Sequence, residues 1–257
     1  MAATKSCVIP QPVAPLFQVV HLPTKVKRWL ILADLHIPYH EPRAVQAALK
    51  YGLKEKCDGA LILGDLIDNH TFSRFPPDAV EPDWLVEVEQ TTRVLKTFKE
   101  HFHVVIWRFG NHEQRIMRWC REHKRDMLGF LSLRRVCEAD QLRIPVYENH
   151  VALRYRELFF LHGDEIRVGN HHVNPAAYAL RKVLDCVLVA HCHRPSMERV
   201  RRFSGDILSG WSIGCLCSLH PHYGPVQPHW QHGFAILPTG ANRSIERKCI
   251  LPDFTVV

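Results

Sequence analysis

The sequence predicts an α/β protein, because short apolar runs that end in polar residues alternate with longer segments of helical spacing. Five of the apolar runs have the length and composition of strands. They are residues 29–34 (WLILAD), 59–65 (GALILGD), 103–110 (HVVIWRFG), 158–164 (LFFLHGD) and 186–191 (CVLVAH). This alternation is typical of an α/β domain.

Three segments carry apolar residues at helical spacing, and the turn residues become frequent only after residue 196. The predicted helices cover residues 43–56, 84–101 and 174–185. Short apolar runs follow at residues 198–203, 206–212 and 233–238. These later runs predict an antiparallel second sheet.

Three segments stand outside this regular plan. Residues 1–27 are rich in proline and are expected to form an N-terminal arm or lead-in strand, and residues 72–84 form a proline-broken loop. Residues 113–140 form a strongly basic helical insertion. We therefore expect a single domain over residues 1–257, with the insertion acting as a helical cap.

Composition limits the classes of protein to consider. The 257 residues are 46% hydrophobic, and no apolar stretch approaches the length of a membrane span, which is roughly 18–20 residues. The first residues also lack the layout of a secretory signal, so we expect a cytoplasmic protein with no membrane partner. The nine cysteines include no CxxC pair, which argues against a zinc ribbon. The net charge of +7 makes nucleic acid a candidate partner without demonstrating one.

Each predicted strand is followed by side chains that can bind a cation. In order along the chain they are Asp34 and His36, Asp65 and Asp68, Asn111, His162, and His191 and His193. The carboxyl ends of strands in an open α/β sheet converge on one crevice, so we expect these groups to face one another. Imidazole is the commonest metal ligand among side chains, and the chain has 18 histidines that do not form a tag.

Taken singly, each group has a simpler interpretation. An aspartate after a strand is most often a turn or helix-cap residue, and a histidine there is usually a hydrogen-bonded residue of the core or surface. An HxH pair reflects only that alternate residues of a strand share a face. The five groups together favour a metal site, because coincidence would have to occur at every strand end.

The order DxH, GDxxD, GNHE, a histidine before glycine, and HxH resembles the calcineurin-like metallophosphoesterase family over about residues 28–240. The resemblance implies a sandwich of two stacked mixed β-sheets flanked by helices. It also implies two divalent metal ions that share Asp65. One ion would be held by Asp34, His36, Asp65 and His193, and the other by Asp65, Asn111, His162 and His191.

Such a metal pair explains the residue types. Two divalent ions about 3.5–4 Å apart clamp a phosphate and lower the pKa of a bridging water, which supplies hydroxide near neutral pH. Carboxylate, imidazole and amide oxygen suit manganese, with iron, zinc, nickel or cobalt as alternatives. The ions outweigh the negative charges of Asp34, Asp65 and the hydroxide, so a phosphate ester would be attracted.

The resemblance also assigns proton transfer. His112 follows the ligand Asn111 and would protonate the leaving group, while Asp68 would hold His112 protonated and correctly aimed. A turn-capping role for Asp68 is the simpler alternative.

Two departures from the family pattern bear on the substrate. Asn69 and His70 stand where the family's phosphoprotein phosphatases carry Arg-Gly, which argues against a Ser/Thr protein phosphatase. His70 is a candidate for contacting substrate phosphate, although an exposed histidine with no role fits equally. Ala190 and Cys192 modify the usual GHTH motif without removing a ligand, and Cys192 places a thiol next to two of them.

Two further segments have open interpretations. Arg115 and Arg118 lie on a cationic flank of the insertion, which would bind substrate phosphates if the insertion covers the crevice. The alternative is a solvated helix face, with Met117, Trp119 or Cys120 packing inward. The histidine-rich loop at residues 218–233 is either a wall of the pocket or a structural crossing.

We therefore expect a binuclear metal-dependent phosphoesterase, with phosphodiesters of nucleotide or nucleic-acid type as the first substrate class. A phosphomonoesterase with the same site is the close alternative. A non-catalytic scaffold that binds protein or nucleic acid is a third hypothesis, although every matched ligand and His112 are present.

Overall fold

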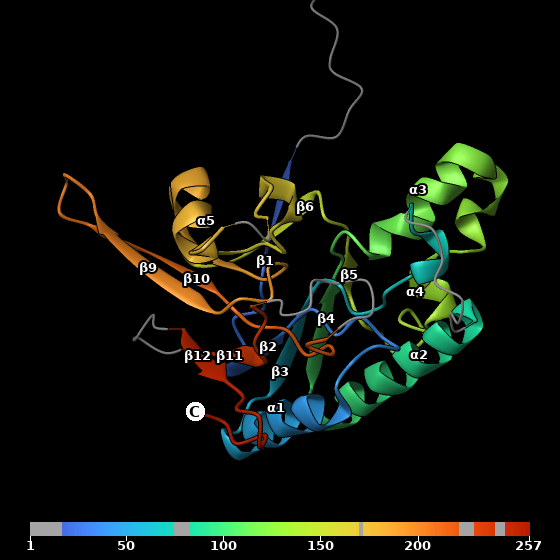
Figure 1. Ribbon diagram of the computed structural model, residues 1–257, viewed down its shortest axis with the longest axis horizontal. Helices are drawn as coiled ribbons and strands as arrows, with labels where there is room; N and C mark the ends of the chain where they lie inside the picture. The colour runs from blue at the N-terminus through green and yellow to red at the C-terminus, as the bar shows by residue number, and fades with distance from the viewer. Residues whose placement is uncertain (1–16, 75–82, 170–171, 221–228, 240–244) are drawn as a thin grey trace, which may run out of the picture.

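Two six-stranded β-sheets stack on each other in the computed structural model, and helices cover their outer faces (Figure 1). The structure describes residues 17–74, 83–169, 172–220, 229–239 and 245–257. This arrangement is the predicted sandwich of two mixed sheets flanked by helices, so the expected fold class is confirmed. Most of the predicted N-terminal arm lies outside the described residues, and its described part contains a strand.

Sheet 1 contains the first three predicted strands side by side. Its order is β12 (Glu246–Cys249), β11 (Gly233–Pro238), β2 (Arg28–Leu32), β3 (Gly59–Leu63), β4 (Val104–Arg108) and β5 (Val146–Tyr147). The strands β2 to β5 run parallel, whereas β11 is antiparallel to both β2 and β12. The carboxyl ends of β2, β3 and β4 therefore lie at one edge of this sheet.

Sheet 2 contains the other two strands that carry candidate ligands. Its order is β1 (Gln18–His21), β6 (Val151–Tyr155), β7 (Leu158–Phe160), β8 (Cys186–Val189), β10 (Ile207–Ser212) and β9 (Ser196–Arg201). The neighbours β7, β8 and β10 run parallel, and β9 returns antiparallel to β10. The candidate ligands thus come from two sheets and not from one.

The expected separate antiparallel sheet after residue 196 is wrong. The strands β9 and β10 extend sheet 2 beside β8, whereas β11 and β12 extend sheet 1 beside β2. Apolar spacing identifies a strand, but the edge that the strand joins depends on distant partners that the local pattern does not contain. Residues 233–237 of β11 are all buried, since this strand lies between two others in the middle of the molecule.

Three of the described helices begin after a residue whose side chain caps them. Glu41, Asp83 and Asn174 each accept a hydrogen bond from a backbone N–H of the first turn, and two of the helices have proline near their start. The helices are α1 (Pro42–Lys54), α2 (Trp84–His101), α3 (Glu113–His123), α4 (Leu133–Val136) and α5 (Pro175–Val183). Three 3₁₀ helices are η1 (His70–Phe72), η2 (Arg125–Gly129) and η3 (Asp164–Ile166).

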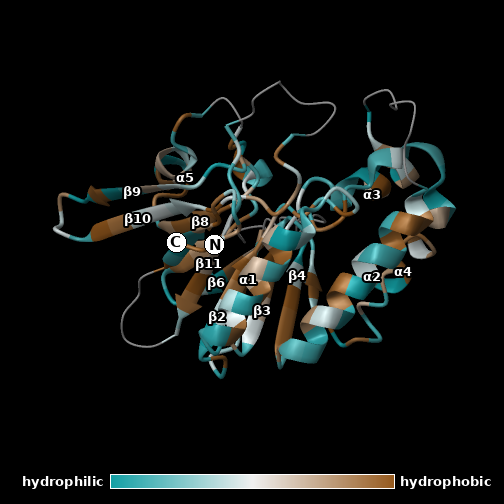
Figure 2. Ribbon diagram, turned by 60° about the horizontal axis from the view of Figure 1, so that its bottom comes forward, coloured by the Kyte–Doolittle hydropathy of each residue, from teal (hydrophilic) through white to brown (hydrophobic). Residues whose placement is uncertain are grey.

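The hydrophobic core has three layers. In the first, Leu30 and Ile62 of sheet 1 pack against helices α1 and α2. The second lies between the sheets, where Leu61 of β3 belongs to the same cluster as Phe160 of β7 and Trp211 of β10. The third packs sheet 2 against α5. Figure 2 shows hydrophilic and hydrophobic residues alternating along α1 and α2, as expected of helices that cover one face of a sheet.

The insertion at residues 113–140 forms α3, η2 and α4 beside the β5 edge of sheet 1 (Figure 1). Cys120 is buried in the first core layer, and Met117 and Trp119 pack against that layer. The inward packing of these three residues is therefore confirmed. The described cysteines are all free thiols, and no described helix has the length and apolar character of a membrane-crossing segment.

Replacing Leu61 by alanine is expected to lower the free energy of unfolding by about 2–5 kcal/mol, because it opens a cavity between the sheets. Leu61 is fully buried, whereas Leu85 on α2 is 64% exposed and provides a matched control. Denaturant unfolding of both alanine variants measures the difference. Equal, small losses in the two variants would contradict the sandwich core.

Candidate metal centre

The candidate ligands lie where the carboxyl ends of parallel strands from both sheets meet. Asp34, Asp65 and Asn111 follow β2, β3 and β4 of sheet 1 within three residues. His162 and His191 each follow β7 and β8 of sheet 2 by two residues. The sequence placed these side chains at strand ends, and the stacking of the sheets brings the ends together.

The first predicted ligand set is compact and buried. Asp34 Oδ1 lies 4.0 Å from His36 Nε2 and 3.4 Å from His193 Nε2. Asp65 Oδ2 lies 3.8 Å from His36 Nε2. The Nε2 atoms of His36 and His193 are only 3.2 Å apart. All four donors therefore face one small volume that a single cation can fill.

The second predicted set shares Asp65 with the first. His162 Nε2 lies 3.1 Å from Asp65 Oδ2, the same oxygen that faces His36. The rings of His162 and His191 are 5.0 Å apart between centroids, and Asp65, His162 and His191 form one candidate ligand cluster. Asp65 thus lies between the two sets, as a bridging carboxylate must.

Three buried polar atoms at this place make no well-oriented hydrogen bond among the described residues, although two of them lie in close contact with another candidate ligand of opposite charge. They are Asp34 Oδ1, Asn111 Oδ1 and His162 Nε2. Leaving a buried donor or acceptor unpaired costs about 1–3 kcal/mol, so such atoms usually have a ligand. Oxygen and imidazole nitrogen in this mixture fit a divalent metal of the first transition row.

The local electrostatics favour positive charge. Burial alone would raise the pKa of Asp65, but His162 and His112 hold that pKa well below its usual range. Burial likewise opposes charge on His162, yet Asp65 raises the pKa of this imidazole well above its usual value. Burial and His162 lower the pKa of His191 to about 4, which leaves it in the neutral form that binds metals.

The backbone at the site is strained. Five candidate ligands have φ in the left-handed region, between 49° and 67°: Asp34, His36, Asp65, His191 and His193. Residues other than glycine rarely adopt this conformation, and it occurs preferentially at functional sites. Backbone hydrogen bonds from His36 to Asp65 and from Asp34 to Gly64 hold two of these loops together. The left-handed backbone conformation directs these side chains toward one another.

Glu113 is a site residue whose role sequence reasoning missed. Its carboxylate accepts hydrogen bonds from the backbone N–H groups of Asp65, Leu66 and Gly110, at 2.7–3.0 Å. It therefore ties the loop after β3 to the loop after β4. Gly110 is required there, because a Cβ atom at this position would lie 2.4 Å from Asp65 Oδ1. The GNHE motif contained Glu113, but only the fold reveals which amides it binds.

Asp68 contacts more groups than the sequence predicted. Its carboxylate lies 3.3 Å from His112 Nδ1, which agrees with the predicted pairing. It also lies 3.0 Å from His36 Nδ1 and 2.9 Å from an Arg115 guanidinium nitrogen. Burial opposes charge on His112, but Asp65 and Asp68 raise the pKa of the imidazole. The simpler turn-capping interpretation of Asp68 does not account for these three contacts.

The three predicted substrate-binding residues lie at different distances from the cluster. Arg115 Nη2 is 3.0 Å from His112 Nε2, so this guanidinium adjoins the predicted proton donor. Arg118 is one turn farther along α3 and is half-buried. His70 is half-buried on η1 and makes an edge contact with Tyr39, with ring centroids 6.2 Å apart.

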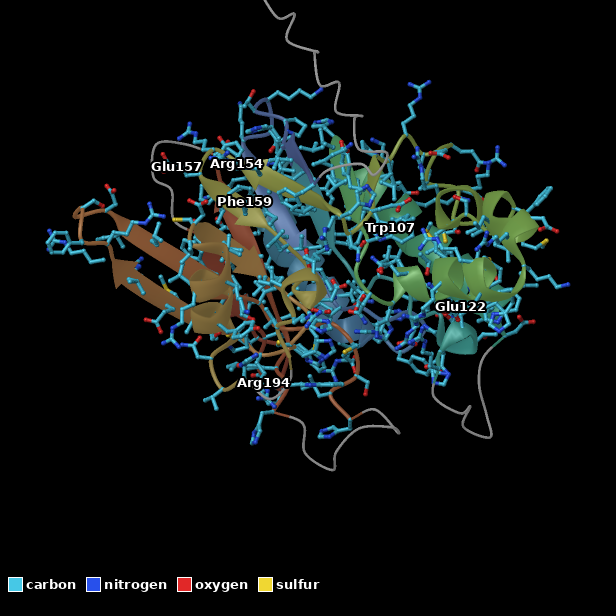
Figure 3. The ribbon with its side chains drawn as sticks, turned by 90° about the horizontal axis from the view of Figure 1, so that it is seen from above. Trp107, Glu122, Arg154, Glu157, Phe159 and Arg194 are labelled. Carbon is cyan, nitrogen blue, oxygen red and sulfur yellow. The ribbon has the colours of Figure 1, made fainter. Side chains whose placement is uncertain are left out.

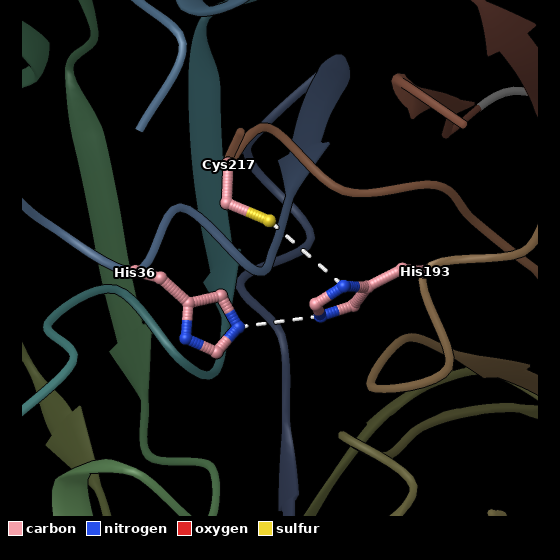
Figure 4. Close-up of side chains that lie close together, drawn as sticks. All are labelled: His36, His193 and Cys217. Carbon is pink, nitrogen blue, oxygen red and sulfur yellow. Dashed lines mark hydrogen bonds between the residues drawn. The ribbon is translucent and has the colours of Figure 1, made fainter. Parts of the chain in front are cut away.

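Cys217 was also missed by sequence reasoning, although it lies in contact with a candidate ligand (Figure 4). Its Sγ is 3.8 Å from His193 Nδ1, on the ring side opposite the Nε2 that faces Asp34. The ring of Trp230 lies 4.3 Å from that of His193. Trp230, in the described part of the 218–233 loop, therefore lies against the site, while residues 221–228 lie outside the described residues.

A buried network supports the loop between Asp68 and η1. Asn69, in the left-handed region at φ 54°, donates from its backbone to Glu87 Oε2 at 2.7 Å and from its side chain to the His112 carbonyl at 3.1 Å. Trp84 Nε1 donates to Asn69 Oδ1 at 2.9 Å. The network links helix α2 to the backbone that carries His112.

The sequence model of the calcineurin-like phosphoesterase family matches residues 27–210. The chain belongs to this family. This family member is similar in structure to Yfce, a phosphoesterase from E. coli, with 15% identity, a TM-score of 0.45, and coverage of 90% of this chain and 96% of that chain. Vacuolar protein sorting 29 from Cryptosporidium parvum shows 12% identity, a TM-score of 0.47 and coverage of 90% and 95%. No curated protein matches this chain significantly.

Glu87 generates a prediction on pH dependence. Burial, helped by the charge of Asp68, raises the pKa of Glu87 from 4.5 to about 8. Its contribution to stability is therefore fully present below pH 4.5 and is lost as the pH rises toward 8. Glu87→Gln should lose less stability than the wild type between about pH 5 and pH 8, as measured by urea unfolding at both values.

Glu89→Gln is the matched control for this prediction, since Glu89 is exposed on the same helix. A difference between Glu87→Gln and wild type that stays constant across the pH range would contradict the buried, neutral state of Glu87.

Proposed function

We propose that this chain is a binuclear metal-dependent hydrolase of phosphate esters, with phosphodiesters as its first substrate class. The observation that carries the proposal is the position of Asp65 Oδ2, which faces His36 at 3.8 Å and His162 at 3.1 Å and so joins both ligand sets. Membership of a phosphoesterase family supports the reaction class.

The residues that would hold the metal ions are those of the two sets. Asp34, His36, Asp65 and His193 would hold one ion, and Asp65, Asn111, His162 and His191 the other. When bound, two divalent ions activate water as the nucleophile and stabilise negative charge on the phosphate. Manganese fits this mixture of carboxylate, amide and imidazole donors, and iron, zinc, nickel or cobalt are alternatives for the same residues.

His112 is proposed to give a proton to the leaving oxygen. Its Nδ1 faces Asp68 at 3.3 Å, which leaves Nε2 directed toward Asp65 Oδ2 at 3.9 Å and hence toward the reacting phosphate. The raised pKa of His112 keeps the imidazole protonated closer to neutral pH. Arg115 Nη2 lies 3.0 Å from His112 Nε2, in the space that a leaving group would occupy. The Arg115 side chain must therefore move aside when the leaving group binds.

A phosphomonoester would use the same ligands, and monoester hydrolysis is therefore the second candidate. The buried Asn111 Oδ1, which has no hydrogen-bond partner among the described residues, disfavours a purely structural scaffold, because a scaffold gains nothing from leaving it unpaired.

Replacing His112 by alanine is expected to lower kcat with added manganese by about 10²–10⁴-fold, because the leaving oxygen would depart without a proton. The loss should be larger for a dinucleotide, whose alkoxide is a poor leaving group, than for bis(p-nitrophenyl) phosphate. Steady-state kinetics on both substrates measure this, with the exposed His101→Ala as control. Equal losses on the two substrates would contradict the proton-donor role.

Asp65→Asn is expected to reduce the manganese bound per chain from about two ions to one or none, since the shared carboxylate serves both sites. Metal analysis after equilibrium dialysis gives the stoichiometry. Asp126→Asn changes an exposed carboxylate of η2 and should retain the wild-type value. A wild type that saturates at a single ion would contradict the binuclear proposal.

A further inference from the structure

Helix α3 leads away from the proposed proton donor. It starts immediately after His112, and its buried side carries Ile116 and Cys120. Arg115, Arg118 and Glu122 follow at helical spacing on the opposite side, so they form one strip along the helix. Figure 3 shows Glu122 at the outer end of this helix.

In the part of the chain that the structure describes, a buried carboxylate neutralises only the first arginine of this strip. Arg115 pairs with Asp68 at 2.9 Å. Arg118 is half-buried and makes no hydrogen bond or ion pair with any residue in the described part of the chain. An arginine that is partly withdrawn from water and has no anionic partner is available for an anionic ligand.

A second guanidinium approaches Arg118 from another segment. Arg74, two residues after η1, pairs with Glu122 at 3.1 Å, which brings it to the same strip. Burial, together with the positive charges of Arg74 and Arg115, lowers the pKa of Arg118, and the exposed Glu122 offsets this only in part. Three guanidinium groups therefore gather at one wall of the site.

The nearby carboxylates of the described residues do not balance this charge. Asp68 is shared by His36, His112 and Arg115, and Glu122 is exposed and engaged by Arg74. Burial raises the pKa of Glu87 to about 8, so this group is mostly neutral at pH 7. The wall has excess positive charge that an added anion would neutralise.

The exposed cations farther along the insertion differ from Arg118. Arg121, Lys124 and Arg125 are all exposed, as expected of a solvated helix face. The solvated-face interpretation therefore fits the end of α3 but not the half-buried Arg118.

We propose that Arg118 and Arg74 bind a second phosphate of the substrate, on the leaving-group side of the scissile ester. The inference rests on the proposed function, because His112 defines the leaving-group side. Arg118 lies three residues beyond Arg115, a rise of about 4.5 Å along the helix. That rise is of the same order as the roughly 3.4 Å of duplex axis per phosphate of one DNA strand. The substrate class is thus a phosphodiester or pyrophosphate with a further phosphate group, as in an oligonucleotide or a nucleoside diphosphate ester.

Matched thymidine dinucleotides test this subsite. The bare dinucleotide dTpdT is compared with dTpdTp and pdTpdT, each of which adds one terminal phosphate on one side. The wild type should prefer one phosphorylated form by about tenfold or more in kcat/KM, as for a charged hydrogen bond. Arg118→Ala should remove the preference, Arg118→Lys should retain part of it, and Arg121→Ala, an equal loss of charge on the same helix, should retain all of it.

A binding measurement separates the effect of Arg118 on substrate affinity from its effect on turnover. Fluorescence anisotropy of a labelled oligothymidylate is measured with His112→Ala and with His112→Ala/Arg118→Ala. The double variant should bind about tenfold more weakly and with a shallower salt dependence. A nucleoside diphosphate sugar assayed in parallel identifies the source, since a preference confined to this compound would assign the subsite to a pyrophosphate and not to a nucleic-acid strand.

The outcomes for the two proposals are distinct. If bis(p-nitrophenyl) phosphate and the dinucleotides are all left intact with added metal, the proposed function is wrong. If they are cleaved but neither the terminal phosphate nor the diphosphate sugar gives a preference that depends on Arg118, or if Arg118→Ala and Arg121→Ala behave alike, only the second-phosphate subsite is overturned.

Discussion

The burial of the Asp65 carboxylate is the constraint on which the site depends. The side chain is almost completely shielded from water. An unpaired negative charge is strongly disfavoured in such a buried position. His162, His36 and His112 therefore surround it, and the backbone N–H of His112 donates to Asp65 Oδ1 at 2.9 Å. These neighbours come from both sheets, so a single buried charge links the two halves of the sandwich.

The sequence was sufficient to predict the strand ends and the polar residues that follow them, because a polar residue directly after a buried strand is a local signal. Asp34 and His162 were found in this way, and the structure brings them within 3.9 Å. The paths of β9 to β12 were not predictable, since pairing with β8 or β2 depends on contacts between distant segments. The positions of Glu113 and Cys217 at the site were not predictable for the same reason. Their contacts depend on which backbone amides or imidazole the fold places beside them.

The site combines a rigid frame with strained loops. Parallel strands buried on both faces hold Asp34 and Asp65 at fixed positions, and Glu113 fastens the loops by three amide contacts. The left-handed residues at the strand ends would relax if this frame loosened. Packing of the hydrophobic core thus maintains a loop geometry that the loops would not adopt by themselves.

The contact between Arg115 and His112 has a consequence for when His112, the proposed proton donor, becomes charged. The guanidinium lies 3.0 Å from the imidazole and lowers its pKa, while Asp65 and Asp68 raise it. A guanidinium that turned from the imidazole toward an incoming phosphate would withdraw one repelling charge. Ligand arrival and readiness of the acid would then be coupled, so that the imidazole holds its proton most firmly only once there is an ester to receive it.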